Sequence, residues 1–593
     1  MSFSPKSYSR YQLLIAGLGG LLYGIDIGII AGALPYLETT AVQAWRLSAQ
    51  QLSFIVAAVL FGSVLSSLFA GALADAIGRK KAMVLAGALF TASIPLIALA
   101  EGYTPLLLGR LLQGISGGLI GVVIPLYLAE SLGAAQRGRG TALFQLLLTI
   151  GLVVAALVGL YQAQAVDAQL LQAGAGEQTA RLAAHDAAWR QIFWACLLPG
   201  LLFTAGVLLL GESPRWLLAR GRAEAALAAL RRGSGPEKAF AELQAMQSAQ
   251  APTARLQARG PLWSRRYLMP FALACVTLAC TQATGINSIL AYAVNILNAA
   301  GLSGALANGA DVAIKTLNAL VTVLAVLLVD RKGRRFLLML GSGGIVLSLL
   351  AAGALFQAAE RGRVDVRPLL AVQGDELELK LDAATWQRLG AAAGQAAQLT
   401  VAWSYGDFRN VQTLRSDQGE ALLRIRRADT VQPDSALGAF FRRLHLNPFA
   451  DPQASAQAPL RIELAERGAV PSQAHGLWVA ACILAFVAFF AVGPGVCVWL
   501  ALSELMPTRI RSNGMSIALL INQFVSTGIA AVFLPTVGQH GYAAMFFFWA
   551  GCTVVYFLVA AFWLPETKGK TLEEIEGHFL RRAGGSAELK AGA

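Results

Sequence analysis

Long apolar runs separated by short polar segments dominate this sequence. A helix needs roughly 20 apolar residues to cross a bilayer core about 30 Å thick. In lipid every backbone amide must be satisfied within the segment, and these runs lack the alternation of membrane strands. We therefore predict an all-α membrane protein with twelve transmembrane helices, at residues 12–34, 52–74, 82–100, 105–129, 141–162, 191–211, 268–296, 308–329, 336–357, 476–503, 513–535 and 541–563.

The composition agrees with this interpretation. Hydrophobic residues make up 56% of the 593 residues and charged residues only 14%, against about 25% charged residues in a soluble domain. A disordered chain, a fibre and an ordinary soluble enzyme are excluded. The sequence also contains no phosphate loop, nucleophile–base set or metal-ligand spacing, so we expect no catalysis, no cofactor and no metal.

The net charge of +13 has an uneven distribution along the chain. Segments predicted to be cytoplasmic carry 28 Lys and Arg, whereas the opposite loops outside 358–475 carry three: Arg46, Arg181 and Arg190. This positive-inside bias predicts a multi-pass plasma-membrane protein, of bacterial inner-membrane type, with both termini in the cytoplasm. The basic excess therefore reflects orientation in the lipid bilayer, and no nucleic-acid partner is expected.

Two charged signatures occur once in each half of the chain. The first is Asp75-x2-Gly78-Arg79, which recurs as Asp330-x2-Gly333-Arg334; the second is Glu130-x6-Arg137, which recurs as Glu504-x6-Arg511. The two signatures are 55 residues apart in the first half and 174 in the second, and residues 358–475 account for the difference. The chain is therefore predicted to be two pseudo-repeated six-helix halves with one insert, an architecture typical of alternating-access transporters.

These features divide the chain into six parts. They are an N-terminal six-helix half (1–211), a cytoplasmic linker with amphipathic helices (212–267), the first three helices of the second half (268–357), the insert (358–475), the last three helices (476–563) and a cytoplasmic tail (564–593).

The insert differs in composition from the rest of the chain. It holds 14 basic and 14 acidic residues, and segments such as Glu376–Leu381, Leu399–Trp403 and Leu422–Arg426 alternate apolar and polar positions. We predict a small, strand-rich extracytoplasmic domain. Three interpretations stay open for it: a decoration without a role in transport, a domain that captures the transported substrate, or a docking domain for an extracytoplasmic partner.

The sequence resembles the sugar porter family of the major facilitator superfamily, which includes proton-coupled bacterial xylose, arabinose and galactose symporters and facilitative glucose transporters. The resemblance rests on runs that occur in order along the chain: GGLLYGIDIGIIAGAL (19–34), GALADAIGRKK (71–81), GRLLQGISGGLIG (109–121), PLYLAESLGAAQRG (125–138), ESPRWL (212–217), TQATGIN (281–287), DRKGRR (330–335), GPGVCVWLALSELMPTRIR (493–511) and PETKGKTLEEIE (565–576). It implies the major facilitator fold, a hexose or pentose as substrate, and rocking between two open states.

The resemblance also implies a sugar site near the middle of the membrane. Sugars need amides to donate and accept hydrogen bonds and an aromatic face for the ring. The residues at the family's sugar-contacting positions are Tyr23, Gln145, Gln282, Asn287, Asn318, Trp499 and Asn522. Four positions depart from the family pattern, namely Thr281, Ala291, Ala491 and Gln523. These departures leave the identity of the sugar open.

Charged residues inside membrane spans are rare and usually functional. Asp26 lies about 21 Å and Arg110 about 22 Å from the cytoplasmic side, at 1.5 Å per helical residue, so the two can meet. In the family, an aspartate at this position is typical of proton-coupled members. We predict that Asp26 carries the proton beside Arg110, with the proton gradient as the energy source; the alternative is a static ion pair. Asp311 and Lys315, one helical turn apart, either pair with each other or line the cavity.

The two signatures resemble the family's cytoplasmic charge network. We therefore predict a gate made of Asp75, Arg79, Glu130, Arg137, Asp330, Arg334, Glu504 and Arg511, the alternative being charges that only fix topology. The function favoured is proton-coupled import of a monosaccharide. The alternatives are a facilitative sugar uniporter and a membrane sugar sensor that does not transport.

Overall fold

The structure is a computed structural model. It describes residues 5–132, 134–173, 178–249, 265–370, 374–392, 395–418, 421–431, 443, 450–497, 505–506 and 511–568. Within these residues ten helices are long and apolar enough to cross a membrane. The last of them joins two helices at Gly541, where φ is 79°. The 29-residue helix Gly304–Lys332 is not among the ten, so the count of twelve stays a prediction.

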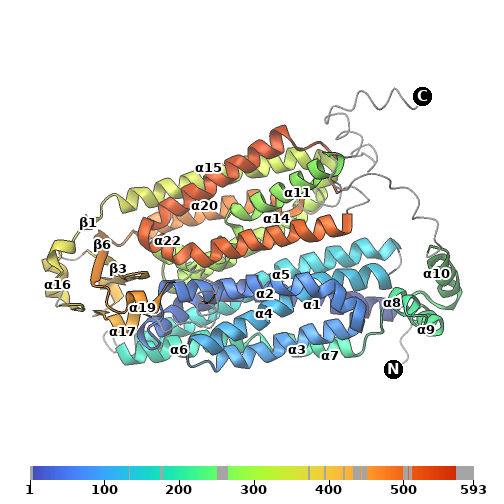
Figure 1. Cartoon of the computed structure of the whole chain (residues 1–593), viewed down its shortest axis with the longest axis horizontal. Coiled ribbons are helices and arrows are strands. Elements are labelled where there is room, and N and C mark those ends of the chain that lie inside the picture. The colour runs from blue at the N-terminus through green and yellow to red at the C-terminus, as the bar shows by residue number, and fades with distance from the viewer. Residues whose placement is uncertain are drawn as a thin grey trace.

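The long helices form two bundles that lie side by side (Figure 1). The first bundle contains α1 (Pro5–Gln43), α2 (Ala49–Ile77), α3 (Arg79–Ala98), α4 (Tyr103–Ser131), α5 (Ala134–Ala173), α6 (Gln178–Trp194) and α7 (Leu197–Leu208). The second contains α11 (Arg265–Ala283), α12 (Ile286–Ala291), α13 (Ala293–Ala299), α14 (Gly304–Lys332), α15 (Arg334–Glu360), α20 (Gln473–Val492) and α22 (Arg511–Phe562). The bundles meet where α5 packs on α14 and α2 packs on α22.

Smaller elements occupy the two ends of the bundles (Figure 1). Three short helices, α8 (Pro214–Ala219), α9 (Ala223–Ser234) and α10 (Pro236–Ala249), lie at one end, which we call the linker end. The insert lies at the other end, which we call the insert end. The linker helices pack on one another through a small apolar cluster that includes Leu217, Leu230 and Leu243.

Close contact between α1 and α5 depends on glycine. Gly20, Gly24, Gly28 and Gly32 recur every four residues and therefore lie on one face of α1. A Cβ atom on Gly24 would lie 1.9 Å from the carbonyl oxygen of Leu148 on α5. Small residues let helix backbones approach in a membrane, where packing rather than water exclusion holds helices together. This face therefore fixes α1 against α5.

The predicted span 268–296 is wrong as a single helix, because it is broken into α11, α12 and α13. The first break follows Ala283. At this break Gly285 has a φ of 84°, a value that residues other than glycine rarely adopt. A Cβ atom on Gly285 would also lie 2.4 Å from the ring of Trp549. Both the backbone angle and the neighbouring ring thus require glycine at the break.

Several helices extend beyond their predicted spans. Helix α6 begins at Gln178 rather than 191, so Arg181 and Arg190, predicted in a loop, are helical. Arg190 binds Asp186 at 2.8 Å and donates to the carbonyl oxygen of Ala98 at 2.8 Å. A charged residue with such partners is compatible with a helix end. The predicted span 191–211 is itself divided, because α6 ends at Trp194 and α7 covers Leu197–Leu208.

The insert has its own hydrophobic core and two small antiparallel sheets. One sheet has the order β1-β6-β3-β4 and the other pairs β2 with β5. The strands are β1 (Val364–Asp365), β2 (Leu377–Leu381), β3 (Ala397–Tyr405), β4 (Phe408–Arg415), β5 (Ala421–Ile425) and β6 (Leu460–Ala469). Short helices α16 (Ala383–Arg388), α17 (Arg427–Thr430) and α19 (Pro452–Ser455) connect them. Trp403, Tyr405 and Trp386 are buried in this core. All three alternating segments of the sequence overlap strands.

The insert contacts both bundles. On the first bundle, Arg46 pairs with Asp429 at 2.6 Å, and the side chain of Asn410 accepts from the first amide of α2 at 3.1 Å. On the second bundle, Arg415 donates to the carbonyl oxygen of Asn298 at 3.2 Å. Directly between the bundles, the amide of Leu534 donates to Ser53 at 3.2 Å. The insert end is therefore held closed in this conformation.

We expect Gly24→Val to separate α1 from α5. The added side chain meets a backbone carbonyl, which cannot move aside like a flexible side chain, so the loss of stability should reach about 3 kcal/mol. Thermal unfolding of the protein in detergent, followed by size-exclusion chromatography, measures this loss. Gly551→Ala is the control, because a Cβ atom there meets nothing within 4 Å. Equal unfolding temperatures for the two variants would contradict the prediction.

Candidate functional site

Three of the predicted sugar-contacting residues form one hydrogen-bonded cluster between α11, α12 and α22. Gln282 donates to Asn522 at 3.1 Å, and Asn287 donates to Gln282 at 3.0 Å. Asn287 also donates to the hydroxyl of Ser526, one turn after Asn522, at 2.8 Å. The sequence analysis missed Ser526, although its spacing of four from Asn522 places both on one helix face.

The break after α11 positions this cluster. Because the helix stops at Ala283 and restarts at Ile286, Gln282 and Asn287 project from two helix ends toward the same face of α22. Thr281, one of the departures from the family pattern, donates to Tyr556 at 2.9 Å and so braces the end of α11. Broken helices near the middle of the membrane are typical of transporter binding sites.

No hydrogen bond joins the other predicted sugar-contacting residues to this cluster among the described residues. Gln145 on α5 is exposed and Asn318 on α14 is partly exposed, and neither side chain hydrogen-bonds to the cluster in the part of the chain that the structure describes. Tyr23 lies on α1 beside Gly117 of α4. Trp499 lies outside the described residues. Three of the seven predicted sugar-contacting residues thus lie in one hydrogen-bonded cluster.

Asp26 lies fully buried between α1 and α4. A Cβ atom on Gly117 would lie 2.8 Å from a carboxyl oxygen of Asp26 and 3.2 Å from the Tyr23 ring, so glycine makes room for both. Neither carboxyl oxygen of Asp26 has a hydrogen-bond partner among the described residues. A buried carboxylate without partners costs far more free energy than a neutral carboxyl group.

Arg110 is also buried but does not form an ion pair with Asp26 in this conformation. It donates to Gln113 at 2.6 Å and lies over the Phe193 ring, 5.6 Å from its centre. The predicted meeting of Asp26 and Arg110 is therefore not seen as a direct contact in this conformation. The guanidinium group of Arg110 is hydrogen-bonded to Gln113, one turn along α4, instead of to the carboxylate of Asp26.

Asp311 and Lys315 form the buried ion pair that their spacing suggests. The two side chains are 2.7 Å apart and at most 1% exposed. The ammonium group of Lys315 also donates to the carbonyl oxygen of Gly28 on α1 at 3.2 Å. The pair therefore links α14 of the second bundle to α1 of the first, two residues from Asp26.

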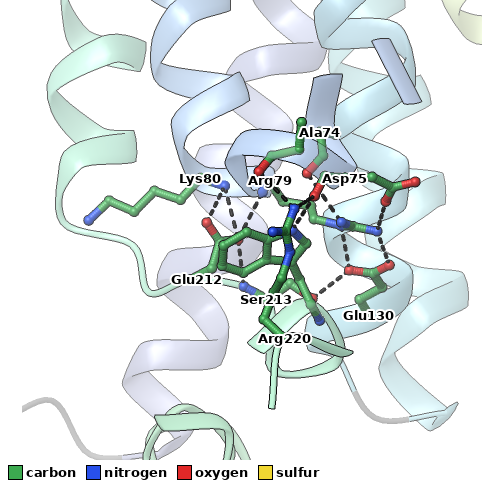
Figure 2. Close-up of polar contacts among 10 residues, drawn as sticks. Ala74, Asp75, Arg79, Lys80, Glu130, Glu212, Ser213 and Arg220 are labelled. Carbon is green, nitrogen blue, oxygen red and sulfur yellow. Dashed lines mark hydrogen bonds and ion pairs between the residues drawn. The ribbon is translucent and has the colours of Figure 1, made fainter. Parts of the chain in front are cut away.

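At the linker end, the first charged signature forms a compact network (Figure 2). Arg79 binds Asp75 at 2.8 Å and Glu130 at 2.8 Å, and Ser213 donates to Glu130 at 2.5 Å. Three of the eight predicted gate residues thus meet in the first bundle, joined by Ser213, the N-cap residue of α8. Nothing is described of the side chain of Arg137.

Glu212 completes this network and was missed by the sequence analysis. Its carboxylate accepts from the backbone amides of Arg79 at 2.9 Å and Lys80 at 3.1 Å, the first residues of α3 (Figure 2). A negative charge there satisfies free amides and interacts favourably with the positive end of the helix dipole. The Glu-Ser-Pro run in which it lies was quoted only for its resemblance.

The second bundle repeats this arrangement. Glu566 accepts from the backbone amides of Arg334 at 3.0 Å and Arg335 at 3.2 Å, the first residues of α15. Gly78 and Gly333, which precede the two capped helices, have φ values of 97° and 89°. The signal for both glutamates was present in the sequence, since each lies within two residues of a proline after the last helix of its half. The side chains of Asp330 and Arg511 are not described, and Glu504 lies outside the described residues.

We expect Lys315→Met to cost more stability than the double variant Asp311→Asn, Lys315→Met. Removing one partner of a buried ion pair leaves an uncompensated charge and costs about 3–5 kcal/mol, whereas replacing both costs little. Thermal unfolding in detergent measures the order. A double variant less stable than Lys315→Met would show that the pair contributes through something other than mutual compensation.

Comparison with known proteins identifies the family. The model of the family "Sugar (and other) transporter" matches residues 13–366 and 464–579, which is most of the chain, and leaves out the middle of the insert. The human proton myo-inositol cotransporter is 27% identical over 96% of this chain and 81% of its own length. The galactose-proton symporter of Escherichia coli K12 is 24% identical over 98% of this chain and 96% of its own. The glucose transporter GlcP of Staphylococcus epidermidis is 24% identical over 98% and 99%.

Solved structures show the same fold. The inward-open xylose transporter XylE of Escherichia coli matches 96% of this chain and 100% of its own with a TM-score of 0.64 at 21% identity. Its partially occluded inward-open form matches with a TM-score of 0.62 at 19% identity. The relatives are transporters, not enzymes. The protein is a multi-pass membrane sugar transporter that belongs to the sugar porter family of the major facilitator superfamily.

Proposed function

We propose that this protein imports a monosaccharide by proton symport, with Asp26 as the proton carrier. The observation that carries the proposal is the environment of Asp26, a fully buried carboxyl group without a hydrogen-bond partner among the described residues. Such a site favours the neutral, proton-carrying form, because an unpaired buried charge is costly. When the helices move and Arg110 faces Asp26, the charged form becomes favourable and the proton leaves.

Several features of the chain support this cycle. The cluster of Gln282, Asn287 and Asn522 offers donors and acceptors for sugar hydroxyls. The relatives include a proton cotransporter for myo-inositol and a proton symporter for galactose. In the proposed orientation all twelve predicted spans cross the plasma membrane, the linker end faces the cytoplasm and the insert end faces outside. The closed insert end then corresponds to an inward-facing state.

The glutamate-capped networks act as the inner gate in this proposal. Arg79 and Arg334 with their partners occupy equivalent places in the two bundles. In an outward-facing state these two regions approach each other, and in the inward-facing state they separate, so they bias a two-state equilibrium. A facilitative uniporter is the second candidate, favoured by the similarity to a facilitated glucose transporter of Xenopus laevis, 25% identical over 96% of this chain.

We expect Asp26→Asn to abolish sugar accumulation against a gradient and to leave downhill exchange intact. Asparagine keeps the shape of the side chain but cannot carry a proton. Uptake of labelled D-glucose, D-galactose and D-xylose into proteoliposomes, with and without an inward proton gradient, measures both activities. Glu101→Gln, an exposed glutamate on a loop at the insert end, is the matched control. Equal, gradient-independent uptake by wild type and Asp26→Asn would establish the uniporter.

We expect Glu212→Gln to slow uptake up to about fivefold without weakening sugar binding. The amide keeps one acceptor for the α3 amides but loses the charge, whose interaction with a helix N-terminus contributes about 1 kcal/mol. Initial rates in proteoliposomes and equilibrium binding to the purified protein separate the two effects. Glu224→Gln on α9 is the control, an acidic residue of the same linker. A weaker sugar affinity with an unchanged rate would refute a gating role.

A further inference from the structure

A large polar cavity lies at the insert end, between the insert and the two bundles. Its volume is about 590 Å³, within the range of about 300–1,000 Å³ typical of small-molecule sites. Three parts of the chain form its wall: the first bundle through Tyr36 and His185, the second through Asn295 and Asn298, and the insert through Thr413. The cavity is thus distinct from the cluster around Gln282.

Two amide oxygens in this wall lack partners. The Oδ1 atoms of Asn295 and Asn298, both on α13, are buried and accept no hydrogen bond from any described residue. The Nδ2 group of Asn295 donates to Glu38 on α1 at 2.8 Å, which fixes the orientation of that amide. A buried acceptor without a donor is costly, so the wall is suited to a ligand that donates hydrogen bonds.

Two of the four carboxylates in the wall pair with arginine, whereas Glu38 and Asp167 accept hydrogen bonds from uncharged amides, the side chain of Asn295 at 2.8 Å and the backbone of Ala305 at 3.2 Å. Asp417 pairs with Arg415 at 2.6 Å, and Glu360 accepts from the amide of Tyr542 at 2.9 Å and pairs with Arg363 at 3.4 Å. Four acidic and three arginine side chains line the cavity, so they nearly balance. The excess of carboxylates disfavours an anionic ligand, and Glu38 and Asp167 offer acceptors to a ligand that donates through hydroxyl groups.

Aromatic rings supply an apolar surface beside these amides. The rings of Phe356 and Tyr542 stack with their centres 5.0 Å apart, and Tyr36 packs edge-on against His185 at 5.2 Å. All four residues line the cavity. Hydroxyl donors together with apolar C–H faces are the chemistry of sugars and cyclitols.

We propose that this cavity is a second binding site, a loading site at the insert end for an uncharged polyhydroxylated ligand, the transported sugar or cyclitol. The inference rests on the proposed function for the identity of the ligand. Strands β3 and β4 of the insert form one wall of the site, and both lie within residues 367–463, which the family model does not match. The insert is therefore part of substrate capture rather than a decoration.

The test counts binding sites on the full-length protein in lipid nanodiscs. Tritiated D-glucose, D-galactose, D-xylose and myo-inositol are each measured by equilibrium dialysis, with D-glucuronate as the charged comparison. Wild type should bind two molecules of the transported ligand per chain and no glucuronate at the loading site. Asn298→Ala should lose the loading site and Gln282→Ala the central site, so each variant should bind one molecule per chain. In proteoliposomes Asn298→Ala should raise the KM of uptake about fivefold at unchanged maximal rate, the loss expected for one hydrogen bond.

Controls separate this result from misfolding. Gln357→Ala truncates an exposed side chain at the same end of α15, outside the cavity wall, and should keep two sites. Thr413→Val, on β4 of the insert, is the second loading-site variant if Asn298→Ala does not fold. It removes a hydroxyl while keeping the shape.

Three outcomes would overturn the proposal. One bound molecule per wild-type chain, lost in Gln282→Ala and kept in Asn298→Ala, would leave only the central site. Two molecules in wild type, Asn298→Ala and Thr413→Val alike would place the second site elsewhere. No uptake of any of the four ligands by wild type would overturn the proposed function and, with it, the identity of the ligand.

Discussion

Polar groups within a membrane must find their partners inside the protein, and this constraint shapes most of what distinguishes the structure. Asp311 and Lys315 pair with each other, and Lys315 ties α14 to α1 through the carbonyl oxygen of Gly28, although one carboxyl oxygen of Asp311 has no partner among the described residues. The amides of Gln282, Asn287 and Asn522 satisfy it by bonding to one another. Asp26 does not satisfy it, because both of its carboxyl oxygens lack partners among the described residues. An unsatisfied group in this setting is more informative than a satisfied one.

The contacts at the two ends of the bundles differ in whether they stay within one bundle or cross between the two. Glycines on α1 allow backbone contact with α5, which in turn packs on α14 of the second bundle. At the linker end, Glu212 and Glu566 each tie the start of one helix to the segment that follows the last helix of the same half. These contacts stay within a bundle. Those at the insert end cross between bundles, so the two ends hold different states.

The insert forms part of the wall of the cavity at the insert end. Its ion pair with Arg46 and its bond to the carbonyl oxygen of Asn298 attach it to both bundles. A domain attached in this way must release one bundle when the end opens. In the proposed orientation, opening this end for sugar entry therefore requires the insert to move relative to one bundle.

The sequence by itself determined the membrane class, the order of the apolar helices, the repeated charged signatures and the sugar porter family, because hydropathy and local motifs are properties of adjacent residues. It also indicated the pair of Asp311 and Lys315, whose spacing of four holds in any helix. Only the tertiary structure decided the break at Gly285, the helical setting of Arg190, the separation of Asp26 from Arg110 and the capping by Glu212. Each of these depends on a partner more than 70 residues away or on a competing neighbour such as Gln113, and sequence spacing carries no information about such distances.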